Sequence, residues 1–174
     1  GNDGQYFRGT SNLNITATDV PDLTGTTDMS YTFLSSGISS VPNMGSWDTS
    51  SVTNMSGMFM NAVSFNGNVS NFDVSSVADM SRMFKGARSF NSGQYNWVTI
   101  NVKDMSSMFE DAESFIGDGL KFWDVSNVTD MSGMFNTATA FNGNVVSWNT
   151  SNVRDMSDMF NRVSSFDRNI SSWD

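Results

Sequence analysis

Acidic side chains recur along this chain at about every 25th residue. Carboxylates at such positions could bind cations or the basic groups of a partner. The column of equivalent positions reads Asp22, Asp48, Asp73, Val98, Asp124, Asn149 and Asp174. If the repeats stack, successive members lie about 5 Å apart, as neighbouring strands do. Carboxylates at that spacing repel one another. The column therefore needs hydrogen bonds, bound cations or a basic partner to offset the repulsion.

Hydrogen bonding within the chain is the first of these three readings. Serines follow two residues after the column, at Ser50, Ser75, Ser126 and Ser151. Asp and Ser in this arrangement commonly serve as side-chain-to-backbone turn residues. The cation reading would use Asp48, Asp73 and Asp124, with calcium as the ion. No EF-hand loop or nonapeptide calcium repeat is present, so no metal site or cofactor is predicted and calcium stays an alternative.

The third reading is a face that binds a protein partner. Residues beside the column differ between repeats, and some are aromatic, a residue class enriched at protein interfaces. The candidate partner-binding residues are Asp48, Asp73, Tyr95, Asn96, Lys121, Phe122, Asp124 and Asn149.

Composition removes several other kinds of chemistry. The chain has no His and no Cys, so it lacks the usual general base and any thiolate ligand. Its two Glu, Glu110 and Glu113, are interpreted as part of a solvated face, and no enzymatic activity is predicted. The net charge of −9 makes nucleic acid a poor partner. Since no apolar run approaches 18 residues, we expect no direct membrane insertion of this fragment.

The elements that would position these residues come from an internal repeat. Its clearest marker is the methionine of an Asp-Met-Ser-like triplet, found at Met29, Met55, Met80, Met105, Met131 and Met156. The intervals are 26, 25, 25, 26 and 25 residues. A period of that size is typical of solenoids built from stacked supersecondary units.

Each unit is predicted to contain a short helix. Met131, Met134, Phe135, Ala138 and Phe141 follow helical spacing, which would place them on one face. The preceding Asp or Asn would cap the helix, at Asp28, Asn54, Asp79, Asp104, Asp130 and Asp155.

A short strand is predicted over Val145–Thr150, after the turn signal Asn142-Gly143-Asn144. Alternation turns two residue columns inward: one contains Trp47, Phe72, Trp97, Trp123, Trp148 and Trp173, and the other Thr49, Val74, Thr99, Val125 and Thr150. An ice-binding face would need such threonines to point outward. The fold class predicted from these units is an α/β solenoid whose core is a ladder of matching apolar side chains.

One domain is expected, made of an array and a cap. Residues 1–27 are predicted to form an irregular N-terminal cap with a degenerate first strand, and residues 1–12 match no part of the repeat. The array of residues 28–174 divides into 28–53, 54–78, 79–103, 104–129, 130–154 and 155–174. Because the last repeat stops within a predicted strand, we expect a fragment of a longer protein.

The fullest copy of the motif is Trp123-Asp124-Val125-Ser126-Asn127-Val128-Thr129-Asp130-Met131-Ser132-Gly133-Met134-Phe135. It closely resembles the BspA-type leucine-rich-repeat surface proteins, also described as mycoplasma-type surface lipoprotein repeats, over residues 20–174. The motif departs at Val98 and Ile100. The resemblance implies a leucine-rich-repeat-like, right-handed superhelix of about six repeats of 25–26 residues.

The same resemblance implies a function. It suggests a non-enzymatic, extracellular or cell-surface-anchored module that adheres to protein partners on host matrix or other cells through an extended repeat surface. A structural stalk or spacer is the first alternative. A calcium- or carbohydrate-binding solenoid is the second.

Overall fold

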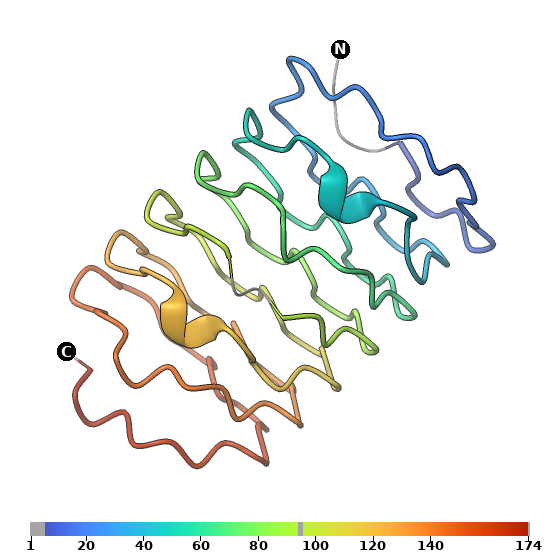
Figure 1. Ribbon diagram of the computed structural model, residues 1–174. Coiled ribbons are helices and arrows are strands. Elements are labelled where there is room, and N and C mark those ends of the chain that lie inside the picture. Colours follow the sequence, from blue (N-terminus) through green and yellow to red (C-terminus); the bar gives the residue numbers. More distant parts are fainter. Residues whose placement is uncertain (1–5, 94–95, 174) are drawn as a thin grey trace.

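The backbone of this protein is built almost entirely of turns and loops (Figure 1). The computed structural model describes residues 6–93 and 96–173. Helical structure in these ranges is limited to two short 3₁₀ helices, η1 (Met44–Ser46) and η2 (Leu120–Phe122). Between 6 and 173, outside the gap, isolated parallel bridges take the place of strands, pairing in series Asp28, Asn54, Asp79, Asp104, Asp130 and Asp155. The predicted α/β solenoid, a leucine-rich-repeat-like right-handed superhelix of strand–turn–helix units, is therefore wrong.

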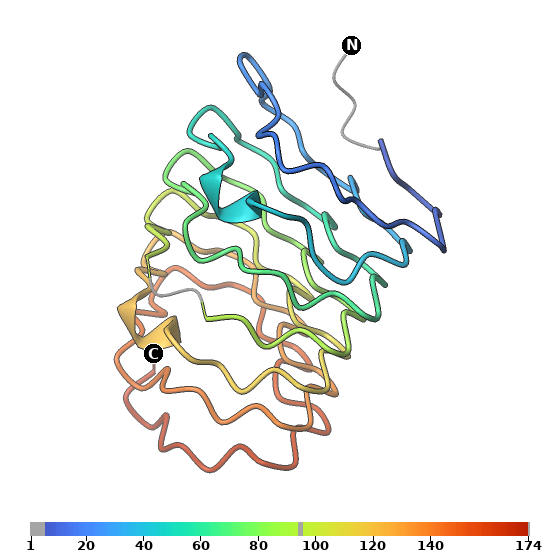
Figure 2. The same cartoon turned by 45° about the vertical axis from the view of Figure 1, so that its right-hand side comes forward.

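Successive 25–26-residue segments instead lie side by side as irregular coils, from one end of the molecule to the other (Figures 1 and 2). Alternate backbone N–H groups donate to carbonyls of the next coil. In one pair of coils, Met131 N donates to Asp155 O at 2.9 Å and Gly133 N to Ser157 O at 2.8 Å. Because N–H groups of each coil donate to carbonyl oxygens of the next coil, neighbouring coils satisfy one another's backbone polar groups.

Tight turns replace the predicted helix over Met131–Phe141. Met134 N donates to Met131 O at 3.1 Å and Ala138 N to Phe135 O at 2.9 Å, both three residues back. The third residue of each turn has a left-handed backbone, with φ of 61° at Gly133 and at Thr137. This combination is typical of type II turns. The same two positions are left-handed in every coil from the first marker on: Tyr31, Ser35, Gly57, Asn61, Arg82, Gly86, Ser107, Asp111, Gly133, Thr137, Asp158 and Arg162.

The predicted helix caps are real hydrogen-bond acceptors, but they cap turns. Asp130 Oδ1 accepts from Ser132 N at 2.9 Å. The equivalent bonds run to Asp28, Asn54, Asp79, Asp104 and Asp155 from the residue two positions on. These residues also form the parallel bridges, so each one fixes its own turn and marks the register between coils.

The segment predicted as a strand, Val145–Thr150, also turns, because Trp148 N donates to Val145 O at 3.1 Å. In this segment and its equivalents in other coils, side chains also join one coil to the next. Thr49 Oγ1 donates to Asp73 O at 2.9 Å, and Thr99 Oγ1 donates to Asp124 O at 2.8 Å. These threonines are buried, which confirms the predicted inward orientation and disfavours an ice-binding face here.

The core consists of stacked aromatic columns, as the repeat pattern predicts. One column, called the first-phenylalanine column, contains Phe33, Phe59, Phe84, Phe109, Phe135 and Phe160. The centroids of neighbouring rings in this column lie 5.3–5.8 Å from each other. The tryptophan column stacks at 5.7 Å between Trp97 and Trp123 and at 6.4 Å between Trp123 and Trp148. Burying matched rows in this way is what holds coils with few regular elements together.

The stack also includes residues within the range 1–12, for which the sequence predicts no place in the repeat. Phe7 N donates to Thr32 O at 2.9 Å, and the Phe7 ring stacks on Phe33 at 5.4 Å. Residues 6–9, Tyr-Phe-Arg-Gly, correspond to residues 83–86, Met-Phe-Lys-Gly. That similarity was the missed signal that residues 6–13 follow the repeat.

Candidate functional site

The outer column of acidic residues is held by hydrogen bonds to the serines that follow it. Asp48 Oδ1 accepts from Ser50 Oγ at 2.6 Å and from Ser50 N at 3.1 Å. Asp124 accepts in the same way from Ser126 Oγ at 2.6 Å and Ser126 N at 3.0 Å, and Asp73 Oδ1 accepts from Ser75 N at 2.9 Å. Asn149 keeps the arrangement with an amide oxygen, accepting from Ser151 Oγ at 2.8 Å. The turn-forming role considered for these residues is therefore present.

These hydrogen bonds also keep the column charged. The Ser50 hydroxyl and then its backbone N–H lower the pKa of Asp48, and Ser126 does the same for Asp124. Ser75 lowers the pKa of Asp73 in the same way. The nearby charge of Asp48 raises this pKa, but its contribution is the smallest. Because a hydrogen bond to the ionised form favours ionisation, the three carboxylates are anionic at neutral pH and exposed to a partner.

Metal binding gains no support from this geometry. Within the ranges the structure describes, no three Asp or Glu side chains come together in a group able to hold a metal ion. The column is a single file of carboxylates interrupted by Val98, and calcium needs six to eight oxygen ligands around one point.

The apolar strip consists of two exposed side chains, one at a position of the acidic column and one two residues before a column member. Phe122, in η2, is 59% exposed and Val98 is 55% exposed. Lys121 Nζ lies 4.8 Å from the centre of the Phe122 ring. Asn96 Nδ2 donates to Asn71 Oδ1 at 3.4 Å, so this candidate is tied to the coil before it. Tyr95, also a candidate, lies outside the described residues.

The two glutamates do not form an acid pair facing a cleft. Lys85 Nζ donates to Glu110 Oε2 at 2.7 Å, with the Glu110 side chain 18% exposed. Arg88 Nε lies 3.4 Å from Glu113 Oε1. Each glutamate therefore pairs with a basic residue one coil earlier, and Glu113, whose side chain is 48% exposed, lies on a solvated face as expected.

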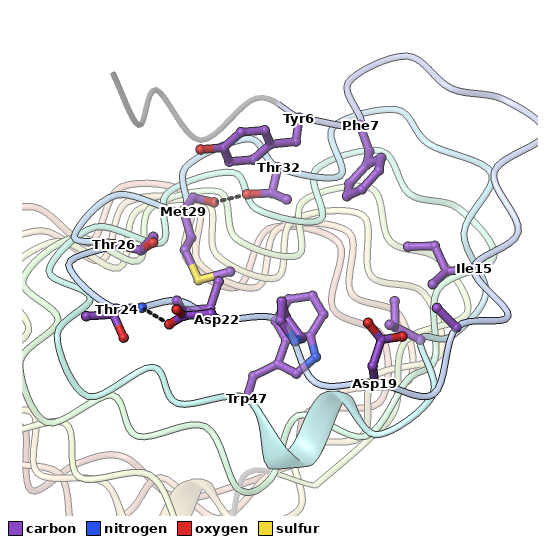
Figure 3. Close-up of a pocket in the computed structure, with 14 residues that line it drawn as sticks. Tyr6, Phe7, Ile15, Asp19, Asp22, Thr24, Thr26, Met29, Thr32 and Trp47 are labelled. Atoms are coloured by element: carbon purple, nitrogen blue, oxygen red, sulfur yellow. Dashed lines mark hydrogen bonds between the residues drawn. The ribbon is translucent and has the colours of Figure 1, made fainter.

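A cavity that the sequence reasoning missed lies at the N-terminal end of the stack (Figure 3). Its volume is about 490 Å³, within the range of small-molecule sites. The walls are mainly apolar, with Phe7, Ile15, Leu23, Met29 and Trp47 among them, and the polar lining residues include Asp19, Asp22, Thr24 and Thr32. No Lys or Arg is among its described lining residues.

The cavity exists because the first coil does not close on the tryptophan column. In later coils the indole Nε1 donates to a carbonyl 28 residues earlier, as from Trp148 to Leu120 O at 3.0 Å and from Trp173 to Val145 O at 3.2 Å. These bonds join coils 25 residues apart, whereas Asp22 and Asp48 are 26 apart, so the corresponding residue for Trp47 is Thr18. Thr18 is exposed where those coils have a buried Leu or Val, and its carbonyl oxygen accepts instead from Asn43 Nδ2 at 2.7 Å.

The open coil leaves the Trp47 indole nitrogen buried and without a hydrogen-bond partner among the described parts of the chain, 6–93 and 96–173. An unsatisfied buried donor is rare and costs about 1–3 kcal/mol. The sequence signal for the cavity was the polar stretch 16–19, Thr-Ala-Thr-Asp, at the level where other repeats carry an apolar residue.

Comparison with known proteins finds one matching family. The sequence model described as "Mycoplasma protein of unknown function, DUF285" matches residues 4–120 and 115–174. No curated protein and no solved structure matches the chain. Among the described residues, no helix is long and apolar enough to cross a membrane.

Proposed function

This chain belongs to the family described as Mycoplasma protein of unknown function, DUF285, and from that premise we propose a non-enzymatic binding module. It recognises basic, partly apolar segments of protein partners through the acidic column and the exposed strip beside it. We place it outside the cell or anchored at the cell surface, as the resemblance of its repeats to BspA-type surface proteins suggests. Adhesion to host matrix or to other cells is the role this proposal implies.

The observation that carries the proposal is a row of ionised carboxylates beside exposed apolar side chains. Asp48, Asp73 and Asp124 have lowered pKa values through their serine hydrogen bonds. Phe122 and Val98 are more than half exposed, and they stand two residues before Asp124 and at a column position, respectively. Aromatic anchors among polar groups are typical of interface hot spots, and complementary charge speeds association and sets the register of the partner.

The test uses a panel of purified extracellular-matrix proteins as probes, with binding measured by surface plasmon resonance. We compare the natural sequence with the triple variant Asp48→Asn, Asp73→Asn and Asp124→Asn. Asn149 occupies the same column and makes the same serine hydrogen bonds, so the variant should fold. We expect at least one probe to bind, and the variant to weaken that binding about tenfold or more, with a smaller loss at high salt.

The matched control removes three carboxylates elsewhere, with Asp111→Asn, Asp118→Asn and Asp167→Asn. Both variants lose three of the nine net negative charges and reach −6, so an effect of overall charge appears equally in both. Phe122→Ser tests the apolar strip, because Ser147 stands at the equivalent position. Equal loss in both triple variants, or no loss in either, contradicts the proposal. Absence of any binding favours the stalk alternative.

A further inference from the structure

The cavity at the N-terminal end has the chemistry of a ligand site. Phe7, Met29 and Trp47 give it apolar walls, and its volume of about 490 Å³ is large for a packing defect. It lies at the first open coil, where the lining residue Asp22 belongs to the acidic column and the lining residue Trp47 is followed directly by Asp48, which the proposed function uses. The inference below does not depend on that function.

Two carboxylates make the cavity a site for positive charge. In the view of Figure 3, Trp47 lies between Asp22 and Asp19. Thr24 N donates to Asp22 Oδ1 at 2.9 Å, and the hydrogen bonds from Thr24 lower the pKa of this carboxyl. With no Lys or Arg among the described lining residues, a cationic ligand group would meet no competing positive charge from them.

One donor in the cavity lacks an acceptor among the residues that the structure describes. The Trp47 indole nitrogen is buried there without a partner, whereas Trp97 donates to Val69 O at 2.9 Å. A ligand carbonyl placed where that backbone carbonyl would have been satisfies the N–H. The ligand therefore needs three groups close together: a cation, a carbonyl acceptor and an apolar body.

We propose that the cavity binds an apolar α-amino acyl group with a free ammonium, carried either by a small amino-acid amide or by the first residue of a peptide. The ammonium faces Asp19 and Asp22, the carbonyl accepts from the Trp47 indole N–H, and the side chain packs on Met29 and Phe7. Capture of a peptide amino terminus is a known recognition mode, and here it uses side chains of an unclosed coil.

The experiment follows the five indole N–H resonances of the full chain by NMR during titration with phenylalaninamide. Trp47→Phe assigns the Trp47 signal, and the variant should fold because Phe72 occupies that column in the next coil. We expect a saturable shift of the Trp47 signal, with the Trp148 signal unchanged. N-acetyl-phenylalaninamide, which lacks the charge, should bind about tenfold more weakly or worse.

Variants separate the roles of the three groups. Asp19→Asn and Asp22→Asn together should weaken phenylalaninamide binding about tenfold, while Asp118→Asn, remote from the cavity lining, should not. Followed by calorimetry, Trp47→Phe should weaken phenylalaninamide about fivefold and leave phenethylamine, which has no carbonyl, unaffected. Should Trp47→Phe fail to fold in thermal unfolding, the aspartate variants carry the test.

The source of the ligand is decided by a tripeptide amide that begins with Phe. Binding about tenfold tighter than phenylalaninamide assigns the site to peptide amino termini, and equal binding assigns it to small amines. The proposal is overturned by the absence of a saturable Trp47 shift up to about 10 mM, by equal binding of the acetylated probe, or by indifference to the aspartate variants.

Discussion

At the scale of single residues, the Asp–Ser pairs of the outer column couple stability to pH. The folded pKa of Asp73 is lowered, first by the Ser75 hydroxyl and then by its backbone N–H. Between that value and the unfolded pKa near 3.9, the unfolded chain binds more protons, so stability rises with pH. The contribution is present above about pH 4 and is lost as the pH falls through the folded pKa.

We predict that in Asp73→Asn the free energy of unfolding falls less steeply as the pH drops below about 4. The amide does not titrate, yet it still accepts the bond from Ser75, as Asn149 does from Ser151. Urea unfolding at pH 7 and at several values below pH 4 should show a small change at neutral pH and a weaker decline in acid. Asp73→Ala is the control: without the acceptor it should lose about 1 kcal/mol at pH 7. An unchanged acid slope in Asp73→Asn would contradict the hydrogen-bond explanation.

The residue-level expectations from sequence held where they rested on local hydrogen bonding. Asp130 and its equivalents were predicted as caps, and each accepts the N–H two residues on. The Trp47 cavity could not be anticipated in the same way. It depends on a coil that fails to close at Thr18, which is a property of the space between repeats rather than of one motif.

At the scale of the element, the predicted helix was wrong because two structures share one apolar pattern. Inward residues at Met131, Met134, Phe135 and Ala138 fit a helix of 3.6 residues per turn and also a turn repeated every four residues. What separates them is backbone conformation, since the third residue of each turn needs positive φ. Gly and Asn at these positions in other coils, such as Gly86 and Asn61, were the available signal.

Thr137 tests this account, because a β-branched residue in the left-handed region is strained. Its φ is 61°, and the equivalent Gly86 has φ 70°. We predict that Thr137→Gly raises the free energy of unfolding by about 1 kcal/mol, since relief of the strain outweighs the added freedom of the unfolded chain. The measurement is chemical denaturation.

The control is Ala140→Gly, three residues on, where φ is not positive. That change only increases backbone freedom and should cost about 0.5–1 kcal/mol. A helix over this segment would predict that both glycines destabilise, so the opposite signs distinguish the two structures.

At the scale of the whole molecule, the sequence period correctly predicted stacked rows and the burial of Trp, Phe and Met within them. It did not predict how the backbone between those rows is paired. Each coil donates alternate N–H groups to the next, as Met105 N does to Asp130 O at 3.0 Å, without forming a strand. Such pairing depends on neighbouring copies, and it is invisible in the propensities of one copy.

Because each coil contacts mainly its neighbours, stability should depend on position along the stack. Phe109 stacks on Phe84 at 5.6 Å and on Phe135 at 5.8 Å, whereas Phe160 has a stacked first-column neighbour, Phe135, on one side among the described residues. We predict that Phe109→Ala costs about 3–5 kcal/mol and Phe160→Ala distinctly less. Denaturant unfolding measures both, with exposed Val98→Ala as a control expected within about 0.5 kcal/mol of the natural chain.

The same chain of contacts determines where the molecule opens first. In a stack with nearest-neighbour coupling, end coils fray at lower free energy than central ones. Hydrogen exchange should therefore protect the amides of Met105 and Phe109 more than that of Met159. Phe109→Ala should lower protection in both flanking coils, while Phe160→Ala should affect only the last coil and the preceding coil, where it stacks on Phe135. Uniform loss of protection in both variants would mean that the coils unfold as one cooperative unit and that coupling is not limited to neighbours.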